Sequence, residues 1–178
     1  MERGIAIMDG LKHKKVIVLA VDFTVLGTTS YKRAIRLIVK GKAETVAESG
    51  IRIHKSMLIP SVIRLIKAIR NLWKKSVEWS KHGVAIRDGY ICQYCGVAIP
   101  KAKVTIDHVI PKAYGGKNSW ENTVCSCFKC NNMKENRTPS EANMALRKKP
   151  VQPTIMEFLL QKIESEGLEE ILKSLGIY

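Results

Sequence analysis

Four cysteines form two pairs with the spacing of a metal-binding turn, Cys92-Gln-Tyr-Cys95 and Cys127-Phe-Lys-Cys130. In a C-x-x-C turn both thiolates can point at the same ion, and Gly96 allows the backbone to fold around it. Two such turns supply four sulfurs, the tetrahedral ligand set that Zn²⁺ prefers. The sequence therefore predicts a structural zinc site, closed to substrate, that is formed by Cys92, Cys95, Cys127 and Cys130.

The fifth cysteine, Cys125, does not extend this pattern. All five cysteines lie between residues 92 and 130, whereas a secreted disulfide framework would more often have an even number spread through the chain. With Cys130, Cys125 would give only a C-x4-C spacing, a poorer match to a metal-binding turn. We therefore expect Cys125 to be a small buried hydrophobic side chain.

A second group of chemically capable residues lies between and beside the two cysteine pairs. Asp107 and His108 are adjacent, Asn122 follows them, and Asn131 comes directly after the last zinc cysteine. A carboxylate can bind a divalent ion, and a neutral imidazole can accept a proton from water. Neighbours on a regular strand point to opposite faces, so a local bend would be needed for the two side chains to converge.

Four segments carry a family resemblance: Arg87-Asp-Gly-Tyr-Ile-Cys-Gln-Tyr-Cys-Gly96, Asp107-His-Val-Ile-Pro111, Gly115-Gly-Lys-Asn-Ser-Trp-Glu-Asn122, and Cys127-Phe-Lys-Cys-Asn131 with Lys134. Together they closely resemble the HNH endonuclease family, in particular the bacterial and phage members braced by a four-cysteine zinc. The resemblance covers about residues 80–142. Segments 32–43 and 60–64 are similar to the N-terminal part of that bacterial group, in which no catalytic residue can be assigned.

The resemblance implies a ββα-metal (His-Me finger) fold, in which two strands are followed by a helix that starts near Phe128. It implies that His108 is the general base and that Asp107 ligates a catalytic divalent ion. Asn122 would hold the loop of His108 through backbone hydrogen bonds. Asn131 would be the second metal ligand, at the position where many members have the final histidine.

An asparagine at this last position affects the choice of metal. An amide oxygen is a harder and weaker ligand than an imidazole, which favours Mg²⁺ or Mn²⁺. The substitution is similar to what Holliday-junction-resolving nucleases of the group use, so it is compatible with activity. Asn132 is an alternative ligand, one residue further round the helix.

Basic residues flank this site in the sequence, where they could contact a phosphate backbone. We predict nucleic-acid contacts for Lys112, Lys117, Lys129, Lys134 and Arg137. Lys134 and Arg137 are three residues apart, so on a helix they would share one face and form a phosphate clamp.

The composition fits a soluble protein with a polyanionic partner. The chain has 178 residues, 46% of them hydrophobic, and a net charge of +14. The charge is +10 over residues 1–79, +7 over 80–150 and −3 over 151–178. Lysine and arginine release counterions from phosphates, so nucleic acid is the expected partner. The charge fits double-stranded DNA, branched DNA, single strands and RNA alike, and we expect double-stranded or branched DNA. The longest apolar run, at 16–21, is far shorter than the about 20 residues of a membrane span, and we expect a cytoplasmic protein.

The helices and strands expected around the HNH-like site indicate an α+β protein in three parts. We predict a basic N-terminal α/β lobe at 1–79, the nuclease domain at 80–150 and a helical tail at 151–178 that could support a homodimer. The expected elements are a strand at 16–21, helices at 31–40, 62–73 and 80–88, short strands at 45–46 and 51–53 around a turn at 49–50, a helix start at Thr138, and tail helices broken near Gly167.

Two other functions are compatible with these patterns. The first is a zinc-braced nucleic-acid-binding module that has lost cleavage because the final asparagine weakens the metal site. The second is a zinc-held protein-interaction domain, which would not need the high positive charge.

Overall fold

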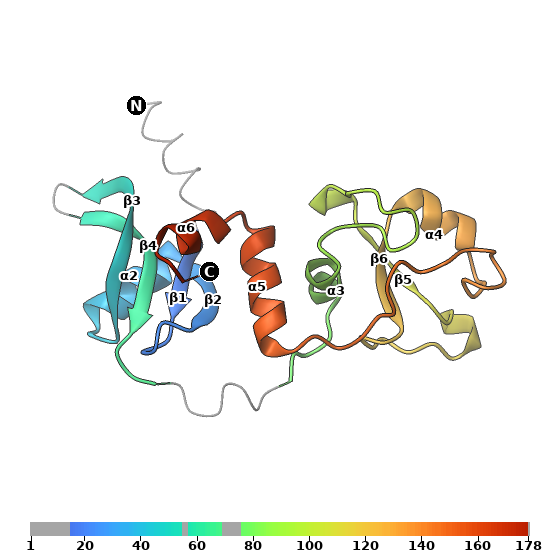
Figure 1. Ribbon diagram of the computed structural model, residues 1–178, viewed down its shortest axis with the longest axis horizontal. Helices are drawn as coiled ribbons and strands as arrows, with labels where there is room; N and C mark the ends of the chain where they lie inside the picture. The colour runs from blue at the N-terminus through green and yellow to red at the C-terminus, as the bar shows by residue number, and fades with distance from the viewer. Residues whose placement is uncertain (1–14, 55–56, 69–75, 178) are drawn as a thin grey trace. The chain divides into compact units, whose positions relative to one another are not determined.

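The computed structural model describes residues 15–54, 57–68 and 76–177. The chain forms two compact units (Figure 1). The first unit comprises residues 1–72 and 166–178, and the second unit comprises residues 73–165. No helix within the described part of the chain is long and apolar enough to cross a membrane.

The first unit is a four-stranded sheet with the order β2-β1-β4-β3. Its strands are β1 (Lys15–Leu19), β2 (Val25–Ser30), β3 (Ala43–His54) and β4 (Met57–Leu65). β1 is parallel to β4, and the other two pairings are antiparallel. The prediction of a strand in the apolar run at 16–21 is confirmed for residues 16–19.

Helix α2 (Tyr31–Val39) packs on this sheet, and it confirms the helix predicted at 31–40. Ser30 caps it, because the Ser30 hydroxyl accepts a hydrogen bond from the Arg33 amide. Ala34 is buried together with Val16 and Ile63 of the sheet. The short helix α6 (Glu169–Ser174) also belongs to the first unit.

The predicted helix at 62–73 is wrong over the residues that the structure describes. Residues 62–65 belong to β4, and residues 69–73 lie outside the described part of the chain. Val62 and Ile63 are fully buried and pair with both β1 and β3. A strand that is buried on both faces is a continuous apolar run, which periodicity alone cannot distinguish from a helix.

The hairpin turn predicted at Ser49-Gly50 is also wrong. β3 continues through it from Ala43 to His54, and its register against β4 shifts between Glu48 and Arg52. Gly50 has a φ of +72°, a conformation that glycine supplies within an irregular strand as well as in a turn.

The capping motif at 138–141 forms without a following helix. The Thr138 hydroxyl accepts from the Glu141 amide at 3.3 Å, and Glu141 accepts from the Thr138 amide at 2.7 Å. The chain then makes turns, with Asn143 at a φ of 54°. The predicted helix start at Thr138 is therefore wrong. The capping hydrogen bonds form, but no helix follows them.

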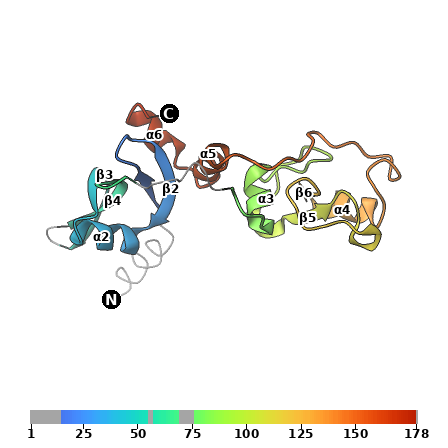
Figure 2. The same cartoon turned by 90° about the horizontal axis from the view of Figure 1, so that it is seen from below.

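The second unit contains the residues singled out for chemistry. Helix α3 (Lys81–Arg87) confirms the helix predicted at 80–88. Strands β5 (Thr105–His108) and β6 (Thr123–Ser126) form an antiparallel pair, and helix α4 (Phe128–Lys134) follows directly. Single 3-10 turns lie at Lys101–Lys103 and Lys112–Tyr114. These elements lie side by side in both views (Figure 1 and Figure 2).

Helix α5 (Ile155–Ser165) completes the second unit. Its Phe158 packs against Ala85 and Ile86 of α3, and meets the ring of Trp120 edge-on at 6.1 Å between centroids. α3 is also tied to β6, because the Arg87 guanidinium donates to the carbonyl of Thr123 at 2.8 Å. This contact fixes the strand from which α4 starts.

Candidate metal and active site

The four predicted zinc cysteines meet at one point of the second unit. The sulfurs of Cys92, Cys95, Cys127 and Cys130 all lie within 4.8 Å of one another. The Cys95 and Cys127 sulfurs are 3.9 Å apart. An ion bound tetrahedrally about 2.3 Å from each sulfur would separate the sulfurs by about 3.8 Å. The cluster therefore fits a metal ion such as zinc.

The cysteine thiols of the second unit differ in pKa. Burial raises the pKa of Cys92, but hydrogen bonds from the amides of Cys95, Cys127 and Tyr94 outweigh it and lower this pKa to about 7. Burial raises the pKa of Cys125 to about 12. Cys125 is buried outside the four-sulfur cluster, as predicted. Cys125 is a neutral packing group at pH 7, whereas the amide hydrogen bonds favour the thiolate of Cys92. Burial raises the pKa of Cys130, which also belongs to the four-sulfur cluster.

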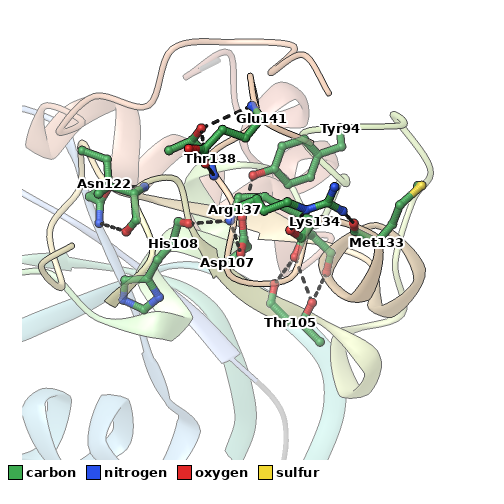
Figure 3. Close-up of polar contacts among 12 residues, drawn as sticks. Tyr94, Thr105, Asp107, His108, Asn122, Met133, Lys134, Arg137, Thr138 and Glu141 are labelled. Carbon is green, nitrogen blue, oxygen red and sulfur yellow. Dashed lines mark hydrogen bonds and ion pairs between the residues drawn. The ribbon is translucent and has the colours of Figure 1, made fainter. Parts of the chain in front are cut away.

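Strand β5 carries the acidic residue of the site. The Asp107 carboxylate is buried and accepts hydrogen bonds from two side chains (Figure 3). The Tyr94 hydroxyl donates to one oxygen at 2.5 Å, and the Lys134 ammonium donates to the other at 3.1 Å. Burial and this hydrogen bond to the carboxylate raise the pKa of Tyr94. Tyr94 lies between Cys92 and Cys95, so the first cysteine turn directly contacts the carboxylate.

Lys134 lies in the interior of the second unit, although a contact to phosphate was predicted for it. Its side chain is only 1% exposed and lies inside the unit. Its ammonium group donates to Asp107 and, at 2.8 Å, to the backbone carbonyl of His108. Lys134 therefore holds the backbone at His108. Its ammonium group is thus engaged inside the unit, whereas an exposed phosphate contact was expected.

Arg137 does not form the predicted clamp with Lys134. α4 ends at Lys134, so the two residues do not share a helical face. The Arg137 guanidinium donates to the carbonyls of Met133 at 2.7 Å and Lys134 at 3.4 Å. Arg137 thus satisfies orphan carbonyls at the end of α4.

Asn122 fastens the loop that follows His108. The Asn122 side chain accepts from the Ile110 amide at 2.8 Å and donates to the carbonyls of Ile110 and Lys117, both at 3.1 Å. The Asn122 carbonyl accepts from the Val109 amide at 2.8 Å. These are backbone hydrogen bonds of the kind predicted for Asn122.

The same loop needs a residue without a side chain at position 116. A Cβ atom on Gly116 would lie 1.8 Å from the Ile110 carbonyl oxygen and 2.8 Å from the Asn122 amide nitrogen. Gly116→Ala is therefore expected to push the loop away from Asn122 and to lower the free energy of unfolding by about 1–3 kcal/mol. Chemical denaturation measures this change. The control is Gly115→Asn, at an open position with a φ of +83° that asparagine tolerates; an equal effect of both variants would contradict the close approach.

His108 has a partner that the sequence analysis did not identify. Its Nε2 atom lies 2.8 Å from the Asn118 side-chain oxygen. When this oxygen accepts, Nε2 carries the proton and the lone pair is on Nδ1. The imidazole points away from the Asp107–Lys134 pair (Figure 3). Asn118 lies within the Gly115–Asn122 segment, but nothing in its spacing distinguishes it from a loop residue.

One cavity is lined by residues that were predicted for catalysis and metal binding. It has a volume of about 560 Å³ and is lined by Asp107, His108, Asn131, Asn132 and Lys134 among others. Lys112 also lines it, whereas Lys117 and Lys129 are exposed outside its lining. Asn131 is half-buried and Asn132 is exposed. The structure thus brings Asp107, His108 and Asn131 to a common space beside the cysteine cluster.

Comparison with known families agrees with this geometry. Residues 92–147, which include the cysteine cluster and the cavity residues, match the HNH endonuclease model. This segment belongs to the HNH endonuclease family. Residues 16–73 match a second model, described as an HNH endonuclease-associated N-terminal domain. No curated protein matches the chain.

The HNH domain is thus a small mixed α/β unit with a cysteine cluster and a polar cavity, preceded in the chain by an associated domain. An HNH endonuclease domain implies a nucleic-acid substrate. Residues 151–165 extend the second unit beyond the matched region, through α5 and its contacts with α3.

The buried ion pair of this HNH domain leads to a stability prediction. Lys134→Met keeps the aliphatic volume but leaves the Asp107 carboxylate buried without its cation, which is expected to destabilise the domain by roughly 3 kcal/mol. Lys129→Met on the same helix is the control, because Lys129 is exposed and such a change costs less than about 0.5 kcal/mol. Thermal melting of both variants measures the difference. Equal melting temperatures would show that the pair contributes nothing.

Proposed function

We propose that this protein is a metal-dependent endonuclease that hydrolyses phosphodiester bonds in DNA, with β5, β6 and α4 as its ββα-metal element. The observation that carries the proposal is the single cavity lined by His108, Asp107 and Asn131 next to the four-cysteine cluster. Phosphodiester hydrolysis needs a base for water and positive charge near the phosphate. His108 can provide the base, and a divalent ion held by Asp107 and Asn131 would provide the charge.

His108 acts as the general base. The Asn118 side chain engages Nε2, which leaves Nδ1 to take the proton from the attacking water. Lys134 fixes the His108 carbonyl at 2.8 Å, and Asn122 fixes the chain two residues further on at Ile110. Because the backbone is held on both sides of His108, the position of the imidazole is fixed during the proton transfer.

Asp107 and Asn131 hold the divalent ion. Each carboxylate oxygen of Asp107 has a lone pair beyond the one engaged by Tyr94 or Lys134. A carboxylate oxygen and an amide oxygen form a hard donor set, which fits Mg²⁺ or Mn²⁺. When bound, such an ion supplies positive charge to a phosphate oxygen. The Lys134 ammonium and Tyr94 hydroxyl hold the carboxylate in one orientation.

The four-cysteine cluster binds a structural Zn²⁺. Its sulfurs come from the turn at 92–95 and from the start of α4. The ion therefore joins the segment that carries Tyr94 to the helix that carries Asn131. A single crosslink would thus hold both Tyr94, which contacts Asp107, and Asn131, which lines the cavity.

Contacts to the DNA backbone are proposed for Lys112, Lys117 and Lys129. Lys112 lines the cavity, and the exposed side chains of Lys117 and Lys129 lie on the Gly115–Asn122 loop and on α4. Arg137 is exposed as well, although its guanidinium is engaged by carbonyls of α4. Double-stranded or branched DNA is the substrate that we propose for these phosphate contacts.

A zinc-braced module that binds DNA without cutting it is the second candidate. It is favoured by one observation, the engagement of both Asp107 oxygens by protein groups. A lysine ammonium on this carboxylate competes with a divalent ion for its charge.

Cleavage of supercoiled plasmid DNA distinguishes the two candidates. The purified protein is expected to nick the plasmid when Mg²⁺ or Mn²⁺ is added, and to bind it without nicking when both are omitted. Linear, nicked and four-way branched DNA, tested in parallel, identify the preferred substrate. Binding without cleavage at every concentration of either ion would contradict the endonuclease and support the binding module.

A further inference from the structure

A row of cations runs along the outer side of helix α2 in the first unit. Lys32, Arg36 and Lys40 are four residues apart. Lys32 and Arg36 lie on the same face of the helix, and Lys40 follows as its C-cap. All three are exposed. With a rise of about 1.5 Å per residue, the row is about 12 Å long. Arg33 and Lys42 are exposed beside it.

These cations have no acidic partner among the residues that the structure describes. Residues 31–42 contain five basic and no acidic residues. Within the described ranges, neither Lys32, Arg36 nor Lys40 forms an ion pair. Arg64 of β4 is different, because it pairs with Glu44 at 2.6 Å. The charge of the α2 row is therefore available to a ligand.

The helix that presents this row is held rigidly. Its opposite side buries Ala34 and packs Leu37 and Ile38 onto the sheet, and Ser30 caps its start. Because the apolar side is covered, α2 cannot insert into a membrane as an amphipathic helix does. A polyanion with regularly spaced charges in solution is the ligand that matches a rigid row of cations.

We propose that Lys32, Arg36 and Lys40 of α2 bind the phosphate backbone of duplex DNA. The first unit is then a second, sequence-independent contact surface, separate from the HNH domain. The identity of the ligand as DNA rests on the proposed function. A row of about 12 Å is long enough to contact consecutive phosphates of one strand. Three cations along it can each neutralise one of them.

The salt dependence of binding tests this proposal. Fluorescence anisotropy measures the binding constant of the full-length protein for a labelled duplex, without divalent ions, over a series of salt concentrations. The slope of log K against log salt changes by about 0.9 for each phosphate contact. The variant Lys32→Gln/Arg36→Gln/Lys40→Gln is therefore expected to have a slope that is smaller in magnitude by about 2.7 than that of the wild type.

A control variant removes the same charge elsewhere on the first unit. Lys15→Gln/Lys67→Gln/Lys173→Gln changes three exposed lysines of other segments, and its slope is expected to remain close to that of the wild type. Equal slopes of the two triple variants would overturn the proposal. So would a loss of binding to anionic lipid vesicles in the α2 variant without any change in DNA binding.

The same assay separates this proposal from the proposed function. Plasmid cleavage by the wild type together with equal slopes for the two variants would leave the endonuclease in place and overturn the α2 contact. A reduced slope for the α2 variant without plasmid cleavage by the wild type would support the α2 contact and contradict the endonuclease.

Discussion

Replacing Cys130 by serine is expected to unfold the second unit and to abolish its zinc content. Cys130 is buried, and its sulfur is one of the four that lie within 4.8 Å of one another. Structural zinc contributes about 10–16 kcal/mol in small metal-folded units, which is comparable to the whole stability of a domain, about 5–15 kcal/mol. Loss of one thiolate ligand should therefore remove the folded state at ordinary temperature. Circular dichroism and metal analysis measure the two effects.

Cys125→Ala is the matched control for this variant. Cys125 is buried in the same cluster of side chains as Cys130 but does not belong to the four-sulfur group. Its substitution should preserve the zinc stoichiometry and shift the melting temperature only modestly. A normal melting curve and unchanged zinc in Cys130→Ser would refute the structural metal site.

Replacing His108 by alanine is expected to lower the single-turnover rate of DNA cleavage by about 10²–10⁴-fold, the usual contribution of a general base. Binding of DNA should persist, because the imidazole is engaged by Asn118 and does not support the core. The zinc content should also be unchanged. The ratio of cleavage rates at saturating protein measures the effect.

His82→Ala is the control for a histidine in the same unit. His82 is exposed on α3 and does not line the cavity, so its substitution should leave the rate of cleavage unchanged. Nicking that is retained at the wild-type rate in His108→Ala would show that the base is another group.

The sequence was sufficient to predict the parts of the site that depend on local spacing. The C-x-x-C turns determine which sulfurs can meet, and the structure places these four together. Asp107 and Asn122 were predicted from a family resemblance, and the structure gives each of them defined partners. Helix α2 was predicted because its cap, its periodicity and its final glycine all lie within a short stretch of chain.

The incorrect predictions depended on distant contacts. A lysine is usually a surface residue, and only the fold places Lys134 beside Asp107, which lies 27 residues earlier in the chain. Val62 and Ile63 match a helical stripe in sequence, but their neighbours on β1 and β3 make them strand residues. The role of Asn118 depends on a loop that brings it to His108. In each case pairing between separate segments overrides local preference.

The position of a divalent ion tests the central claim most directly. A crystal of the protein grown with Mn²⁺ and measured at the manganese absorption edge would locate the ion by its anomalous signal. We predict a peak in the cavity within about 2.3 Å of an Asp107 carboxylate oxygen and of the Asn131 amide oxygen. A Mn²⁺ ion bound at another place, with the Lys134 ammonium still the only cation at Asp107, would contradict the metal site proposed at Asp107 and Asn131.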